Sequence, residues 1–211
     1  MKKTILLVFD FDGTLADSHE EVLAAMEFSC KKLNLGLPSV EELRNTPAKD
    51  LIKTLKLGPY KIYRMLQYSR SYLKKSSKEV KLFSGMPALL SSLNQNVFEF
   101  HIVSTNTQEK ILRTLKNEGI EVLFSSVQGN MGLWSKKNAL EKLGRKYPFS
   151  QKIYVGDEER DILAAQEAGF EALSVGWGFK SAELLQGFQP RYFVRHIKQF
   201  EALLQSFVQA L

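Results

Sequence analysis

The sequence predicts an α/β protein: a parallel β-sheet with helices on both faces, and an all-helical domain inserted after the first strand. Two observations lead to this prediction. Short apolar runs, typical of strands buried on both faces, alternate with amphipathic segments of helical length. One long stretch near the start lacks such runs and carries only the helical period. The alternation is typical of βαβ units, and the stretch that interrupts it is expected to form a separate helical domain.

The expected strands are five apolar runs, each separated from the next by a segment long enough for a helix. Gly119 and Gly169 stand where the glycine that ends a helix is expected. The strands are predicted at Ile5–Phe9, Phe98–Val103, Val122–Ser126, Ile153–Val155 and Ala172–Val175. The helices of this α/β unit are predicted at Met86–Leu93, Thr107–Glu118, Ser135–Arg145, Glu159–Ala168 and His196–Leu211.

The interrupting stretch runs from Asp17 to about Leu82 and holds only two of the 13 glycines. We expect three helices in it, and a capping box of Ser18 with Glu21 opens the first. The predicted organisation is a core of residues 1–16 and 83–211 and a helical cap of residues 17–82. The cap should lie over the carboxyl ends of the strands, where open α/β sheets bind ligands. The helices are marked by Leu33 at the end of the first, by Leu51, Ile52 and Leu55, and by Ile62, Leu66 and Leu73, with Pro38, Pro47 and Pro59 at the turns.

The composition argues against a membrane-spanning segment and a disulfide-bonded fold. The longest apolar run, Ile5–Phe9, is far shorter than the roughly 20 residues that cross a bilayer. Asp10 and Asp12 interrupt what would otherwise imitate a signal peptide. Cys30 is the only cysteine, so neither an intramolecular disulfide nor a cysteine-rich zinc site can form. We therefore expect a cytoplasmic protein.

Basic residues outnumber acidic ones, 29 to 23, which gives a net charge of +6. The excess is local, because the segment from Lys49 to Lys81 carries ten basic and two acidic residues, a difference of +8. It can be interpreted as a solvated helical face, as a field that draws in small anionic substrates, or as a nucleic-acid surface. No zinc finger, aromatic RNA-binding signature or basic zipper supports the last interpretation. We expect neither nucleic acid nor a membrane as a partner.

Two carboxylates follow the first predicted strand in the segment DFDGTL. Side chains alternate along an extended chain, so Asp10 and Asp12 are expected on the same side, and Gly13 allows the chain to turn after them. Two such carboxylates repel each other and need a cation, a shared proton or both. The pair therefore predicts a Mg²⁺ site with one ionised and one protonated partner, with ordinary turn chemistry as the alternative.

A second acidic segment, GDEERD, enters a helix directly after the fourth predicted strand. Asp157 ends that strand as Asp10 ends the first, and Asp161 follows one helical turn later. Acids at a helix start also interact favourably with the helix dipole, which is the structural alternative. A cluster of acids at two strand ends of one parallel sheet would concentrate negative charge, and a bound hard cation would neutralise it.

Two further strand-to-helix junctions carry polar side chains. Ser104, Thr105 and Asn106 follow the second strand, where hydroxyl and N–H groups at a helix start can bind an anion. Asn106 with Glu109 also fits a simple helix cap. Lys136 and Lys137 stand near the start of the helix after the third strand, and a lysine beside a phosphate and an aspartate would neutralise both.

In this order and spacing, DFDGTLADS, the hydroxyls, the lysine and GDEERD resemble the haloacid dehalogenase-like (HAD) phosphohydrolases, within them the phosphoglycolate-phosphatase-like branch with a helical cap. The resemblance covers nearly the whole core, whereas the cap matches in position, length and helical character. It implies a Rossmann-like core and a Mg²⁺-dependent phosphatase of small phosphorylated metabolites. The +8 charge of the cap would then favour a second anionic group on the substrate.

The resemblance also implies roles for individual residues. Asp10 would be the nucleophile that becomes an aspartyl phosphate, and Asp12 the acid/base for the leaving alcohol and then for water. Mg²⁺ would be held by Asp10, by the backbone carbonyl of Asp12 and by Asp157, with Asp161 orienting these ligands.

The phosphate site that the resemblance implies rests on the remaining motifs. Ser104 is the first choice for the phosphate-binding hydroxyl, and Thr105 is the alternative, because the two alignments differ by one residue. Lys136 is preferred over its neighbour Lys137 as the lysine that ties the phosphate to the nucleophile. The family's common Lys-Pro pair is absent. Asn106, Gly13 and Thr14 complete the expected phosphate site.

Other functions fit parts of the pattern. A phosphomutase of the β-phosphoglucomutase type could use the same residues and return the phosphoryl group to a sugar. A dehalogenase would leave Asp12 and the GDEERD acids unexplained, and a non-catalytic phosphate-binding protein has no reason to keep all of them. Dinucleotide binding is disfavoured because no GxGxxG follows a strand. The protein is expected to be a monomer or a homodimer. Trp177-Gly178-Phe179 after the last strand resembles a family loop, with packing the more ordinary role for its aromatic rings.

Overall fold

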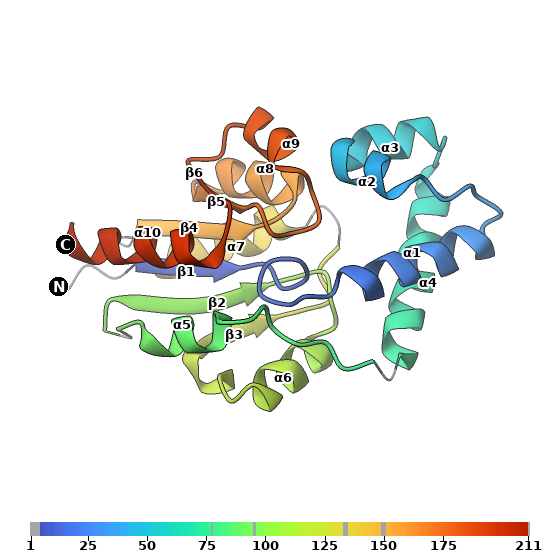
Figure 1. Ribbon diagram of the computed structural model, residues 1–211. Helices are drawn as coiled ribbons and strands as arrows, with labels where there is room; N and C mark the ends of the chain where they lie inside the picture. Colours follow the sequence, from blue (N-terminus) through green and yellow to red (C-terminus); the bar gives the residue numbers. More distant parts are fainter. Residues whose placement is uncertain (1–4, 77, 95, 133–134, 149–150, 211) are drawn as a thin grey trace.

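The computed structural model describes residues 5–76, 78–94, 96–132, 135–148 and 151–210 (Figure 1). In these residues six strands form one sheet with the order β3-β2-β1-β4-β5-β6, and all neighbouring pairs are parallel. The predicted α/β class is confirmed. The strands are β1 (Ile5–Phe9), β2 (Phe98–Val103), β3 (Phe124–Gln128), β4 (Gln151–Gly156), β5 (Glu171–Val175) and β6 (Tyr192–Val194).

The central strand β1 is buried on both faces, because its side chains alternate between two apolar clusters. Ile5, Leu7 and Phe9 face one cluster, and Leu6 and Val8 face the other. Helices cover both faces of the sheet. The first cluster includes residues of α5 (Met86–Ser92), α6 (Gln108–Asn117) and α10 (Ile197–Gln209), and the second includes residues of α7 (Lys136–Lys146), α8 (Glu159–Glu167) and α9 (Ala182–Gly187).

The chain changes the side on which it adds strands at β1, and this switch point positions the candidate site. The chain adds β2 and β3 on one side of β1, then β4, β5 and β6 on the other. Phe9 at the end of β1 is therefore in register with Val155 near the end of β4, and the backbone N–H of Asp10 donates to the carbonyl of Val155 at 2.8 Å. The segments that follow β1 and β4 consequently leave the sheet side by side at its carboxyl edge.

Four helices follow β1 before the chain returns to the sheet. They are α1 (His19–Lys32), α2 (Val40–Asn45), α3 (Ala48–Thr54) and α4 (Pro59–Lys75), and they lie beyond the tips of the strand arrows in Figure 1. The outgoing and returning chains pair at a single bridge between Ala16 and Leu82. The division into a core of residues 1–16 and 83–211 and a cap of residues 17–82 stays a prediction.

The structure differs from the sequence expectations at short elements. The short helices α2 and α9 and the three-residue strand β6 were not expected, because each carries too few residues to reveal a period. A 3₁₀ turn at Glu121–Leu123 occupies the predicted start of the third strand, so β3 begins two residues late, at Phe124. No helix among the described residues combines the length and the apolar character that crossing a bilayer requires.

The predicted capping box at the start of α1 is wrong. Ser18 is the residue before the helix, but its side chain makes no capping hydrogen bond. Glu21 instead forms an ion pair with Lys110 of α6, and the two side chains are only 3% and 5% exposed. A buried charge requires a partner of opposite sign, and a lysine from a distant helix meets that requirement better than a backbone N–H group.

We predict that Glu21→Ala lowers the free energy of unfolding by about 3–5 kcal/mol, because it leaves Lys110 buried without a counter-charge. Urea unfolding of the variant measures the change. The neighbouring Glu20 pairs with Lys78 at the surface, so Glu20→Ala is the matched control and should change stability little. Equal losses in the two variants would contradict the prediction.

Candidate active site

Asp10 lies at the carboxyl end of β1 and is 5% exposed. Its Oδ1 accepts a hydrogen bond from the backbone N–H of Phe11 at 2.7 Å, and its Oδ2 accepts one from the ammonium of Lys136. Strand β1 is fully buried beneath it, so the backbone that carries Asp10 is held by the sheet. The carboxylate is thus fixed at the point where ligands bind in open α/β sheets.

Lys136 is the first residue of α7 and is also buried. Its Nζ donates to Asp10 and, at 2.7 Å, to Oδ1 of Asp161. Burial disfavours the charged amine, but the two carboxylates more than compensate and raise the pKa of Lys136 well above its ordinary value. Lys137 is 41% exposed and pairs with Glu141 and Glu167 on the surface. Of the two adjacent lysines, Lys136 is the one that lies beside the expected nucleophile.

Asp157 follows β4 and is 1% exposed. Its Oδ1 accepts from the hydroxyl of Thr14 at 2.9 Å, and its Oδ2 accepts from the backbone N–H of Phe179 at 2.8 Å. Two glycines make room for it: a Cβ built at Gly13 would lie 2.2 Å from Oδ2, and one at Gly178 would lie 2.1 Å from the Asp157 Cβ. Two chain segments, 13–14 and 178–179, therefore close around this one carboxylate.

Asp10, Asp157 and Asp161 form a carboxylate cluster in which one oxygen from each residue lies within 4.8 Å of the others. Burial, followed by the charges of nearby acids, raises the pKa of Asp157 well above its ordinary value, so the cluster favours an added positive charge. Buried carboxylate oxygens are the donors that hard divalent cations prefer. The three residues could therefore hold a divalent metal ion. The ligand set expected from the sequence, with the Asp12 carbonyl in place of Asp161, stays a prediction.

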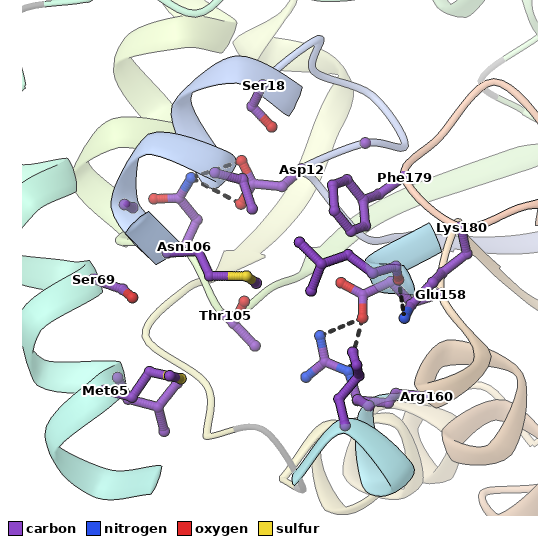
Figure 2. Close-up of a pocket in the computed structure, with 18 of the residues that line it drawn as sticks. Asp12, Ser18, Met65, Ser69, Thr105, Asn106, Glu158, Arg160, Phe179 and Lys180 are labelled. Atoms are coloured by element: carbon purple, nitrogen blue, oxygen red, sulfur yellow. Dashed lines mark hydrogen bonds and ion pairs between the residues drawn. The ribbon is translucent and has the colours of Figure 1, made fainter. Parts of the chain in front are cut away.

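Asp12 is separate from that cluster and has a different partner. Both of its carboxylate oxygens accept from Nδ2 of Asn106, at 3.0 and 2.9 Å (Figure 2). Burial raises the pKa of Asp12 to about 6, so its carboxyl group can carry a proton close to neutral pH. The alternative role of Asn106 as the cap of α6 is wrong, because the side chain of Thr107 accepts the capping hydrogen bond instead. Asn106 thus contacts the expected acid/base directly.

The two candidate phosphate-binding hydroxyls occupy different environments. Ser104 is fully buried, and its Oγ accepts a hydrogen bond from the backbone N–H of Asn106 at 3.2 Å. Thr105 is half-buried and lines the cavity described below (Figure 2). Both residues lie at the carboxyl edge between β2 and α6, and the assignment of the phosphate-binding hydroxyl to one of them stays open.

A cavity of about 270 Å³ extends from these carboxylates into the four helices α1 to α4. Asp10, Asp12 and Asp157 line its end at the sheet, together with Gly13 and Asn106. Its other end is walled by α1, α3 and α4, from which Met65 and Ser69 are seen in Figure 2. The cavity joins the carboxylates to a space large enough for an organic substituent.

The comparisons with known proteins agree with this geometry. Residues 7–175 match the haloacid dehalogenase-like hydrolase family. The chain belongs to this family. A phosphoglycolate phosphatase from Synechococcus elongatus is 32% identical over 186 residues, which are 85% of this chain and 87% of that protein. A pyrophosphatase PpaX from Oceanobacillus iheyensis is 28% identical over 201 residues, which are 91% of this chain and 92% of that protein. The resemblance inferred from the motifs is confirmed.

Solved structures of the family share the fold over almost the whole chain. A haloacid dehalogenase-like hydrolase from Streptococcus pneumoniae superposes with a TM-score of 0.76 at 26% identity, covering 96% of this chain and 99% of its own. A predicted phosphatase from Clostridium acetobutylicum superposes with a TM-score of 0.81 at 21% identity, covering 97% of this chain and 100% of its own. The segment that forms α1 to α4 is therefore part of the shared fold.

Two buried side chains of the core hold the helices α2 and α3 against this hydrolase core. Nζ of Lys180 donates to the carbonyls of Leu43 and Thr46 at 2.8 and 2.6 Å. Glu159 accepts from the backbone N–H of Ala48 at 2.6 Å. Both residues are less than 5% exposed. Neither role is recognisable from the sequence, because a side chain that binds backbone groups leaves no pattern in it.

Glu158 and Arg160 also line the cavity, and sequence reasoning missed them although they lie within GDEERD. Arg160 donates to Oε2 of Glu158 through Nε at 2.8 Å and through Nη2 at 2.5 Å (Figure 2). The available signal was the motif itself, in which two charged residues stand between the two aspartates. The pair lines the cavity with its charges largely cancelled.

The basic segment of the cap faces outwards. Eight of its ten basic residues are exposed. Arg64 stacks on the ring of Tyr68, 4.7 Å from the ring centroid. Arg70 lines the cavity but donates to the carbonyl of Met131 at 2.8 Å. The +8 charge thus creates an electrostatic field outside the cap, which can attract anions over a distance. The second anionic group on the substrate, which was expected from this charge, stays a prediction.

We predict that Gly178→Ala disrupts the site, because the added Cβ would overlap Asp157. It should lower the free energy of unfolding by about 1–3 kcal/mol, as overpacking does in other proteins, and thermal unfolding measures this change. Gly187 has no neighbouring atom within 4 Å of a built Cβ, so Gly187→Ala is the matched control and should leave stability nearly unchanged. A Gly178→Ala protein as stable as the control would contradict the prediction.

Proposed function

We propose that the protein is a Mg²⁺-dependent phosphatase that hydrolyses a small phosphorylated metabolite through an aspartyl-phosphate intermediate. One observation carries the proposal: Asp10 is held at the sheet edge between a lysine and two further buried aspartates, and it opens into a cavity. A carboxylate in that position can attack phosphorus while neighbouring cations neutralise the phosphate charge.

The donor chemistry of the cluster fits Mg²⁺. It offers carboxylate oxygens and, among its described members, no sulfur or imidazole ligand, which is the set that a small hard cation prefers. Asp10 and Asp157, with the Asp12 backbone carbonyl, would hold the ion, and Asp161 would orient them through its hydrogen bond with Lys136. When bound, Mg²⁺ would neutralise charge on the phosphate oxygens and hold the phosphoryl group in line.

The residues divide the reaction into two displacements. In the first, a carboxylate oxygen of Asp10 forms a bond to phosphorus while the ester P–O bond breaks, and Asp12 gives its proton to the departing alkoxide oxygen. In the second, Asp12 takes a proton from a water molecule whose oxygen bonds to phosphorus, and the bond between phosphorus and Asp10 breaks. Phosphate leaves and Asp12 is again protonated, so the cycle closes.

Other side chains would orient these groups. Lys136 neutralises Asp10 and remains able to contact a phosphate oxygen, because an ammonium has three N–H donors. Asn106 aims the Asp12 carboxyl group through two hydrogen bonds. Ser104 or Thr105, with the backbone at the start of α6, would bind the phosphate. Gly13 and Thr14 shape the loop beside it, and Thr14 also orients Asp157.

The relatives narrow the reaction class. Names such as phosphoglycolate phosphatase and pyrophosphatase describe hydrolysis of small phosphorylated compounds, and we extend that class to this chain. The cytoplasmic location and a monomeric or homodimeric state stay predictions. The phosphomutase alternative differs in the acceptor of the second displacement, a sugar hydroxyl in place of water.

We predict that Asp10→Asn abolishes phosphate release, because the amide is a poor nucleophile and the attacking oxygen is lost. A panel of phosphorylated metabolites assayed for inorganic phosphate checks this, with Mg²⁺ and with EDTA. EDTA should abolish release by the native protein, and added Mg²⁺ should restore it. Phosphate release that persists in Asp10→Asn would remove the assigned nucleophile, and an isomerised sugar phosphate would favour the phosphomutase.

We predict that Lys136→Met lowers kcat at least 100-fold, because it removes the cation between Asp10 and Asp161. Lys137→Met is the matched control on the adjacent residue and should keep kcat within about twofold, since Lys137 pairs only with surface acids. Steady-state kinetics on the same substrate compare the two variants. A larger loss in the Lys137 variant would reverse the assignment.

A further inference from the structure

We propose that the alcohol released by this enzyme carries an extended apolar group, aliphatic or aromatic, which occupies the cavity between the cap helices. The inference rests on the proposed phosphatase function and names its substrate class. The observation behind it is the contrast between the two ends of the cavity: the end at the sheet is charged, and the end in the cap is almost wholly apolar.

The apolar wall is built from three helices that face one another. Each contributes side chains at helical spacing, so each turns one stripe towards the cavity. Helix α1 contributes Val22, Ala25, Met26 and Cys30, α3 contributes Leu51 and Ile52 with Leu55 just beyond it, and α4 contributes Ile62, Met65, Leu66 and Leu73. These side chains continue directly from Asp10 and Asp12, so a phosphate held at the carboxylates would extend its organic part along them.

The apolar stripes of two helices are only partly covered by the protein itself. All residues of α3 and α4 are described, and none of them is buried, although α4 is 17 residues long. Ile62, Met65 and Leu66 remain half-buried around the cavity instead of closing into a packed core. When a ligand covers such half-buried apolar surface and removes it from water, the free energy of the complex is lowered.

The cations in and beside the cavity wall are already engaged. Lys136, beside the cavity, binds Asp10 and Asp161. Lys180 and Arg70, which line it, donate to backbone carbonyls. Arg160 is neutralised by Glu158. Its buried Nη1 has no partner among the described residues and can donate to an oxygen acceptor.

A second negative charge on the substrate would therefore meet mostly acids and hydrocarbon in this space. Among the described lining residues, Arg70 is a cation without an acidic partner, and its guanidinium is directed to the carbonyl of Met131. Burial of an unpaired carboxylate is strongly unfavourable. The outward-facing lysines can still attract the phosphate dianion that every monoester carries. Apolar contact then selects among the esters that arrive.

The test is a series of n-alkyl phosphates from ethyl to hexyl, with phenyl phosphate and phosphoglycolate, assayed on the native protein with Mg²⁺. We expect kcat/KM to rise by up to about fourfold for each added methylene, the factor that corresponds to burial of one CH₂. Phenyl phosphate should exceed ethyl phosphate, and phosphoglycolate should fall below both. Values of kcat/KM that are independent of chain length, or a preference for phosphoglycolate, would overturn the inference.

Two variants on α4 distinguish an effect of the cavity wall from a general effect of mutating this helix. Met65→Gln keeps the side-chain length but makes the wall polar, and should lower the ratio of hexyl to ethyl phosphate kcat/KM at least threefold. Tyr63, two residues away, is 57% exposed and outside the cavity wall, so Tyr63→Gln is the matched control and should leave the ratio unchanged. An equal ratio in both variants would argue against the cavity as the binding site.

A binding measurement distinguishes failure of this inference from failure of the proposed function. Calorimetric titration of Asp10→Asn and of the native protein with n-alkyl phosphonates, which have no ester bond to cleave, reports affinity without turnover. Affinity that rises with chain length supports the apolar site even if no ester is hydrolysed. Hydrolysis without any dependence of affinity or kcat/KM on chain length overturns the inference and leaves the phosphatase intact.

Discussion

The site depends on one electrostatic constraint: several carboxylates must remain together in a buried place. Asp10, Asp157 and Asp161 converge there because β1 and β4 are neighbours and end in register. Lys136 supplies one positive charge between two of the acids, which makes their burial tolerable and leaves a need for a further cation. The fold thus provides the attraction for a divalent cation before any ligand is bound.

Much of the core follows from the sequence, because its signals are local. Continuous apolar runs predict β1 and β2 with their observed limits. The motifs after β1 and β4 predict that Asp10 and Asp157 lie together, while Asp12 lies apart from their cluster. The features that were missed depend on contacts between distant segments. Glu21 fits a local capping box in the sequence, but in the structure it pairs with Lys110, 89 residues away. Lys180 and Glu159 bind backbone groups of α2 and α3, which no residue pattern records. The apolar cavity likewise appears only when three helices are placed together.

Charge and shape have separate roles in the cap. Most of its basic side chains face solvent, where they act over several ångströms and are screened by salt. Its inner surface is hydrocarbon, which discriminates only at contact. The net charge, which the sequence gives, therefore affects how a substrate approaches the protein. The arrangement of α1, α3 and α4 instead determines which organic groups the cavity can hold.

The contacts of Lys180 have a consequence for any movement of α2. Its ammonium bridges the carbonyls of Leu43 and Thr46, so swinging α2 away from the core would expose that ammonium to water and break both hydrogen bonds. Any separation of α2 from the core is therefore coupled to rehydration of a buried amine.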